Sequence, residues 1–199
     1  MASFVPQDLG FAETAPIIFQ SIGVVAGTPQ EVWDTILDYE RWPQWFTSVK
    51  TCRATSDPAT GVGSTRVVTI AGGAAIVEEF IAWDEPKVWA FTGLEGPPIF
   101  QSLVERVTLV ELGPNLTEVT YRMAIEPRRG LGPFVKLARG GIEKNLKVAL
   151  RNLNQAVGAR RPPVVDEPVI APPAAAPNAG DDDGHDEAHD HPHPHPHTD

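Results

Sequence analysis

Four polar side chains in the middle of the chain are candidates for acid–base chemistry: Arg66, Glu79, Glu105 and Tyr121. Period-two alternation places Glu105 on the apolar face of its strand, whereas the strand around Glu79 is apolar on both faces and its phase is ambiguous. A carboxyl buried in an apolar site has a raised pKa and can act as a general acid or base on a carbonyl-bearing ring. A buried pair of acid and arginine is also a common structural feature, so both interpretations stay open.

Histidine is absent from the predicted folded body, because all six His lie at or beyond His185. This distribution excludes Ser–His and Cys–His nucleophile pairs, histidine general bases and most transition-metal sites from the body, where we expect no cofactor. Cys52, the single cysteine, has no histidine to activate it, and we interpret it as a structural residue. One cysteine excludes an internal disulfide and fits a reducing compartment.

The tail predicted at residues 159–199 is rich in Pro and Ala and then in acidic residues and His. It has too few large apolar residues to fold. Its alternating imidazoles can gather around a divalent ion such as Ni, Zn or Cu. The predicted ligands are His189, His191, His193, His195 and His197. A solubilising, pH-responsive tail is the alternative.

Charge and hydropathy limit the classes of partner. Residues 162–199 hold nine of the 26 Asp and Glu and no Lys or Arg, so the other 17 acidic residues nearly balance the 16 basic ones. A nearly neutral body is not typical of nucleic-acid binding, and we expect no nucleic-acid partner. No apolar run reaches the roughly 18 to 20 residues that cross a bilayer, and the N-terminus lacks a signal-peptide pattern. We therefore expect a cytoplasmic protein without a transmembrane segment.

The order of predicted elements is strand, helix, short helix, six strands and a long helix. A lead-in at residues 1–16 has no regular pattern and is expected to be loosely attached. Thr28, Pro29 and Glu31 have the spacing of a helix N-cap with a capping box, and an aromatic segment at residues 39–46 follows that helix. The predicted strands are residues 17–26, 49–55, 64–71, 74–83, 87–94, 101–112 and 117–126, and the turns between them suit antiparallel hairpins.

The longest predicted helix spans residues 132–158. Apolar residues recur along it at steps of three and four, so one face is expected to cover the sheet. Gly140 and Gly141 lie inside this pattern, where two glycines cost about 1.5 to 2 kcal/mol relative to alanine. They predict a hinge that gates a pocket, or alternatively a kink or close packing. The gate would close a mouth formed by residues 97–100 and 128–133.

The run SIGVVAGTPQEVWDTILDYERWPQWFTSVKTCRA, followed by six strands and the long helix, resembles the polyketide cyclase/dehydrase and lipid-transport family of the SRPBCC (START/Bet v 1-like) superfamily. Its most specific parts are the helix start at Thr28, Pro29, Val32 and Trp33 and the turn from Asp38 to Trp45. The resemblance covers residues 17–158. It implies an α+β helix-grip (Bet v 1-like) fold, in which a seven-stranded antiparallel sheet wraps around the C-terminal helix. Two short helices would lie near the N-terminus.

The implied cavity between sheet and helix is the expected site for an apolar ligand. The residues predicted to line it are Trp89, Phe91, Leu103, Val107, Tyr121 and Met123 on the sheet and Ile142, Leu146 and Leu150 on the helix. The first functional hypothesis is binding or carrying of a hydrophobic small molecule, either a lipid or an aromatic, polyketide-like compound. The alternatives are an aromatase/cyclase-like enzyme that uses acid–base catalysis and a regulatory interaction module.

Overall fold

A computed structural model gives the structure of residues 1–160, and the predicted tail ligands from His189 to His197 lie outside these described residues. The helices are α1 (Phe11–Thr14), α2 (Pro29–Leu37), α3 (Trp42–Trp45), α4 (Gly132–Leu137) and α5 (Arg139–Arg160), with a 3-10 turn at Tyr39–Arg41. The strands are β1 (Ala2–Ser3), β2 (Ile17–Val25), β3 (Val49–Ala54), β4 (Thr65–Ile70), β5 (Ala75–Asp84), β6 (Val88–Gly96), β7 (Phe100–Gly113) and β8 (Leu116–Pro127). Each of the seven predicted strands is present, with bounds that differ from the prediction by at most two residues.

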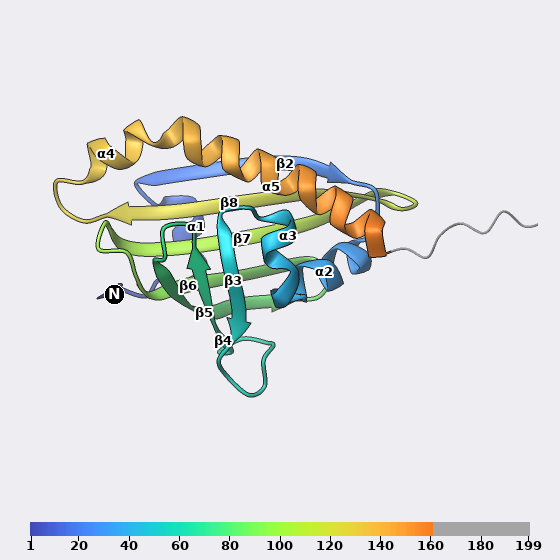
Figure 1. Cartoon of the computed structure of the whole chain (residues 1–199), viewed down its shortest axis with the longest axis horizontal. Coiled ribbons are helices and arrows are strands. Elements are labelled where there is room, and N and C mark those ends of the chain that lie inside the picture. The colour runs from blue at the N-terminus through green and yellow to red at the C-terminus, as the bar shows by residue number, and fades with distance from the viewer. Residues whose placement is uncertain (161–199) are drawn as a thin grey trace, which may run out of the picture. The chain divides into compact units, whose positions relative to one another are not determined.

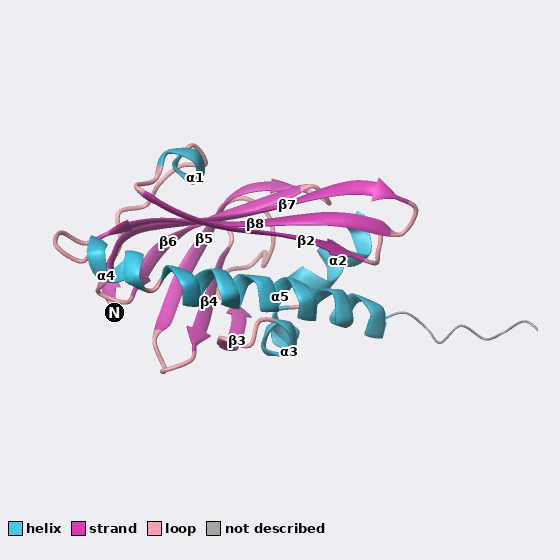
Figure 2. Cartoon of the chain, turned by 90° about the horizontal axis from the view of Figure 1, so that it is seen from above, coloured by secondary structure: helices cyan, strands magenta, loops and turns pink. Residues whose placement is uncertain are grey.

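The seven long strands form one antiparallel sheet in the order β2-β8-β7-β6-β5-β4-β3. Consecutive hairpins build this order from β3 to β8, and β2 then pairs with β8. Figure 1 shows α5 running across the sheet, and Figure 2 shows that α5 and α1 lie on opposite sides of it. The predicted α+β helix-grip fold is confirmed.

The long helix differs in detail from its prediction, because a break at Ala138 divides it into α4 and α5. A Cβ added at Gly140 or Gly141 would meet nothing within 4 Å, so close packing does not explain these two glycines. The buried residues of α5 begin only at Leu146 and continue to Val157. The C-terminal part of α5 therefore attaches the helix to the sheet, while its first turns are more exposed.

Capping and indole hydrogen bonds fix the segment between β2 and β3. The Thr28 hydroxyl accepts from the Glu31 amide at 3.2 Å and the Glu31 carboxylate accepts from the Thr28 amide at 2.7 Å, which confirms the capping box at the start of α2. After α2 ends, the Trp42 indole donates to the Ile36 carbonyl at 2.6 Å. This bond holds the aromatic helix α3 against the preceding helix and directs its rings into the core.

Residues 1–16 are not the loosely attached lead-in that the sequence predicted. β1 pairs with β6, and Phe4 is buried, with its amide donating to the Leu94 carbonyl at 2.8 Å. A Cβ at Gly93 or Gly96 would come within 2.6 or 2.5 Å of the Phe4 ring, so the ring occupies space that only glycine leaves open. Such a fit depends on tertiary contacts and leaves no periodic signal in the sequence.

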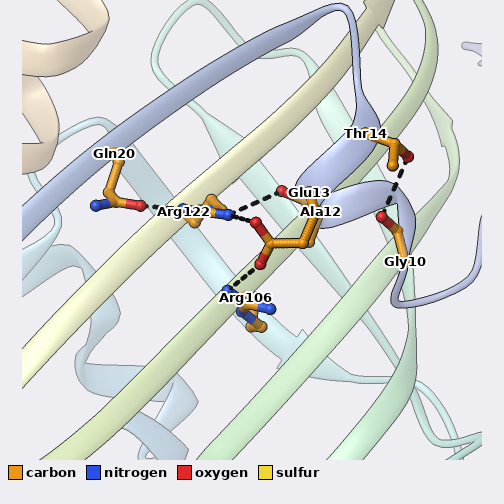
Figure 3. Close-up of polar contacts among 7 residues, drawn as sticks. All are labelled: Gly10, Ala12, Glu13, Thr14, Gln20, Arg106 and Arg122. Carbon is orange, nitrogen blue, oxygen red and sulfur yellow. Dashed lines mark hydrogen bonds and ion pairs between the residues drawn. The ribbon is translucent and has the colours of Figure 1, made fainter.

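The α1 helix covers the outer face of the sheet. Ala12 is fully buried against Val104 on β7 and Ala124 on β8. Figure 3 shows the polar contacts beside this cluster, where the Glu13 carboxylate pairs with Arg106 at 2.7 Å and also with Arg122. Because the sequence of α1 places a small residue under the helix and an acid at its edge, the helix can lie close to the sheet.

Replacing Phe4 with alanine is expected to lower the free energy of unfolding by about 3 kcal/mol, since it leaves a cavity against Gly93 and Gly96. Urea denaturation of the full chain measures this change. Val5→Ala is the matched control, because Val5 is 52% exposed and should change stability by less than about 0.5 kcal/mol. Equal stabilities of the two variants would show that the Phe4 ring contributes little to folding.

Candidate functional site

A cavity of about 240 Å³ lies between the concave face of the sheet and α5. Its wall combines residues of the sheet with residues of α3 and α5, and most of it is apolar. The lining residues are Trp42, Phe46, Ser48, Val49, Val68, Ile70, Ala71, Ile76, Glu78, Phe91, Phe100, Leu103, Glu105, Tyr121, Met123, Ile125, Ile142, Asn145 and Leu146. This volume lies just below the range of about 300 to 1,000 Å³ that is usual for small-molecule pockets.

Six of the nine residues predicted to contact a ligand line this cavity: Phe91, Leu103, Tyr121, Met123, Ile142 and Leu146. The other three are buried core residues outside the wall, and the prediction is corrected for Trp89, Val107 and Leu150. Alternation gives the face of a strand but not the distance along it at which the helix separates from the sheet. Residues 128–133 of the predicted mouth do not line the cavity, whereas Phe100 does.

Glu105 and Tyr121 form the polar part of the cavity floor. Both lie on the concave face, Glu105 on β7 and Tyr121 on β8, and they are diagonal neighbours because Glu105 is opposite Met123. The Tyr121 hydroxyl donates a hydrogen bond to Oε2 of Glu105. Both side chains are buried, so the predicted inward direction of these two candidates agrees with the structure.

Arg66 and Glu78 form a buried ion pair next to this floor. They are opposite each other on β4 and β5, and Nε of Arg66 lies 2.6 Å from Oε2 of Glu78. The guanidinium carbon also lies over aromatic rings, at 4.2 Å from the centre of Trp42 and 4.8 Å from that of Phe91. Its Nη1 and Nη2 have no hydrogen-bond partner among the described residues, so cation–π contacts take the place of hydrogen bonds on that side.

Two of the predicted polar groups lie elsewhere than expected. Glu79 is partly exposed on the outer face of the sheet, and Glu78 takes the inward position instead. The period-two rule left this choice open, because both sets of alternate residues in β5 are rich in apolar side chains. Arg66 is fully buried but does not line the cavity, since the rings of Trp42 and Phe91 stand around it.

Burial controls the protonation of these groups. It raises the pKa of Glu105 to about 8, and the charge of Glu78 adds to that shift, whereas the Tyr121 hydroxyl and Arg66 oppose it. Burial also raises the pKa of Glu78, and the adjacent Arg66 guanidinium opposes this shift. The pKa of the buried Cys52 thiol is raised to about 12, mainly by desolvation, so this thiol is a poor nucleophile at neutral pH.

The predicted ligand contacts did not include the aromatic residues Trp42 and Phe46 or the polar residues Ser48 and Asn145, yet all four line the cavity. At the partly exposed rim, the Asn145 amide on α5 donates to the Ser48 hydroxyl at 2.8 Å, which joins the helix to the start of β3. The aromatic density of residues 39–46 was the one available signal for this wall.

Within residues 1–160, no three His, Cys, Asp or Glu side chains cluster closely enough to hold a metal ion. No helix in this range combines the length and hydropathy that spanning a bilayer requires.

The family was identified by comparison with known proteins. Residues 19–158 match the family described as polyketide cyclase / dehydrase and lipid transport. The chain belongs to this family. An uncharacterized protein of Mycobacterium tuberculosis is 30% identical over 152 residues, which cover 76% of this chain and 91% of the relative. A protein of Mycobacterium bovis matches to the same extent.

Solved structures of the superfamily share the fold of this family member. A START superfamily protein from Mycobacterium smegmatis gives a TM-score of 0.59 at 19% identity, covering 71% of this chain and 97% of that one. The Zhui aromatase/cyclase from Streptomyces sp. R1128 gives a TM-score of 0.60 at 16% identity, covering 72% and 94%. At these identities the likeness shows the fold alone.

Replacing Glu78 with glutamine is expected to lower the free energy of unfolding by about 3 to 5 kcal/mol, because it leaves the Arg66 guanidinium buried without its counter-charge. Urea denaturation measures the loss. Glu79→Gln is the matched control, since the same change on the outer face should cost less than about 0.5 kcal/mol.

The double change Arg66→Met with Glu78→Leu should cost less than Glu78→Gln alone, because it removes both charges together. A double variant less stable than Glu78→Gln would show that aromatic contacts of Arg66, rather than charge compensation, dominate the site.

Proposed function

We propose that this protein binds a largely apolar small molecule in the cavity between the sheet and α5. The observation that carries the proposal is the cavity itself, about 240 Å³ of space that the surrounding core residues leave unfilled. Natural cores are packed so closely that voids much larger than a water molecule are few, so a space of this size beside a fully packed core suggests a ligand. Membership of a family described in part by lipid transport supports the same function.

The chemistry of the wall indicates the kind of ligand. Aromatic and aliphatic side chains surround most of the space, and the polar groups are confined to the floor at Glu78, Glu105 and Tyr121 and to the rim at Ser48 and Asn145. The ligand is accordingly apolar along its length, with few polar atoms. Binding requires no cofactor in the folded domain, and a cytoplasmic location belongs to this proposal.

A second candidate function is proton transfer to or from a bound carbonyl compound. The observation that favours it is Glu105, which lies in the cavity wall and whose pKa is raised to about 8 by burial. A carboxyl with a pKa near neutrality can both donate and accept a proton. The family description, which names cyclase and dehydrase activities, agrees with such chemistry.

The binding function is tested by blocking the entrance. Ile142→Trp places a larger ring in a partly exposed wall position and should weaken binding of the neutral dye N-phenyl-1-naphthylamine on the order of tenfold, about 1.4 kcal/mol. Fluorescence titration measures the affinity. Leu137→Trp is the control, because Leu137 is 86% exposed and does not line the cavity, so its affinity should stay that of the unmodified protein. Absence of dye binding to the unmodified protein, or equal affinities of the two variants, would contradict the proposal.

The catalytic candidate predicts exchange of the methyl protons of 2-acetonaphthone in deuterated water. NMR should show exchange that exceeds the buffer rate and that Glu105→Gln slows by about 100-fold, the usual scale of one acid–base group. Glu79→Gln keeps the wall intact and should exchange at the rate of the unmodified protein. Exchange at the buffer rate in all three proteins would remove the catalytic candidate and leave the binding function in place.

A further inference from the structure

We infer that the Glu105 carboxyl is a hydrogen-bond donor that receives the carbonyl oxygen of a neutral, otherwise apolar ligand at the floor of the cavity. The inference rests on the proposed binding function and adds to it the polar group that the ligand carries. The two carboxyl oxygens of Glu105 have different surroundings, and this difference is the starting observation. Oε2 accepts from the Tyr121 hydroxyl, whereas no residue of the described chain hydrogen-bonds to Oε1.

The free oxygen belongs to a side chain that is only 5% exposed and that lines the cavity. Oε1 is accessible from the cavity, so a ligand that covers it must supply a hydrogen bond or leave the oxygen unsatisfied at a cost in free energy. Tyr121 cannot supply a second bond, because its single hydroxyl proton already points to Oε2. The unsatisfied position is thus available to a ligand.

The charges around Glu105 decide which partner that oxygen takes. Among residues 1–160, the cation whose charge acts on Glu105 is Arg66 on β4, and its Nε lies 2.6 Å from Oε2 of Glu78 on β5. From β8 the neighbour is Tyr121, a hydroxyl, and α5 contributes only Ile142, Asn145 and Leu146 to the wall, none of which titrates. Glu105 therefore has a nearby carboxylate in Glu78 and no cation of its own.

This arrangement keeps a proton on Glu105 at neutral pH. Burial raises its pKa to about 8, and the charge of Glu78 adds to the shift. Because the Tyr121 hydroxyl donates to Oε2, the proton occupies Oε1, the oxygen without a partner. The floor of the cavity consequently presents an O–H donor, which a ketone, aldehyde, ester or lactone carbonyl satisfies. An anionic ligand is disfavoured because its charge would be repelled by the Glu78 carboxylate. Arg66 would not compensate this repulsion, since it is already paired with Glu78.

The test compares ligands that differ only at the polar group. 2-Acetonaphthone carries a carbonyl, 2-isopropenylnaphthalene replaces its oxygen with CH₂, and 2-naphthoate carries a negative charge. Equilibrium dialysis of the full chain at pH 6.5 should show the ketone binding about five- to tenfold more tightly than the alkene, the scale of one net hydrogen bond. Naphthoate should bind more weakly than the ketone.

The pH dependence has a defined sign. The affinity for the ketone is full while Glu105 is protonated and falls as pH rises through about 8, whereas the affinity for the alkene stays constant. At pH 9.5 the preference for the ketone should be lost. In Glu105→Gln the amide oxygen accepts from Tyr121 and the NH₂ group donates to the ketone, so the preference should persist at both pH values. In Glu105→Leu the preference should vanish while the alkene still binds.

Each outcome separates the inference from the function on which it rests. Equal affinities for ketone and alkene at pH 6.5, tighter binding of naphthoate, or a pH dependence that survives in Glu105→Gln would overturn the carbonyl subsite and leave the binding function standing. Failure of all three compounds to bind, together with failure of the neutral dye, would overturn the binding function itself. Circular dichroism of each variant verifies that folding is intact at both pH values.

Discussion

The concave face of the sheet carries buried ionisable groups, and the rest of the site follows from this constraint. A buried guanidinium is costly unless it is paired, and Arg66 is paired with Glu78 directly across from it. Only one side of the guanidinium is satisfied in that way, so aromatic rings cover the remainder. Two of these rings, Trp42 and Phe91, also form the cavity wall. The same packing that compensates the charge therefore shapes the space that a ligand would occupy.

The cavity stays open because α5 meets the sheet along only part of its length. Side chains from Leu146 to Val157 are buried, and Asn154 accepts from the Ala26 amide at 2.7 Å, so this part of the helix is fixed. In the first turns of α5 the residues are exposed or only partly buried, and of these Ile142 and Asn145 reach the cavity wall. Close packing at one end of α5 and looser contact at the other leave the internal space between the helix and the sheet.

Most of the fold and part of the site could be predicted from the sequence, and the difference has physical causes. Strand alternation correctly directed Glu105 and Tyr121 inward, because the buried apolar residues of their strands lie mainly on one face. In β5 both faces are apolar, so Glu79 was chosen where Glu78 is inward. Counting outward from the turn at Gly72 would have resolved this choice, since Arg66 and Glu78 are equally distant from that residue and pair across the hairpin. The contact of Phe4 with Gly93 joins segments that are far apart in the sequence, so counting residues from a turn could not have predicted it.

The polar floor also bears on the choice between binding and catalysis. Turnover of a carbonyl compound needs an acid that polarises the oxygen and a separate base that removes a proton from carbon. Glu105 has the properties of the acid, but the other carboxyl in the wall, Glu78, is held by Arg66. Tyr121 already donates its proton to Glu105, and a high pKa keeps its hydroxyl from acting as a base. With an acid present and no free base among the described wall residues, the geometry recognises a carbonyl more readily than it transforms one.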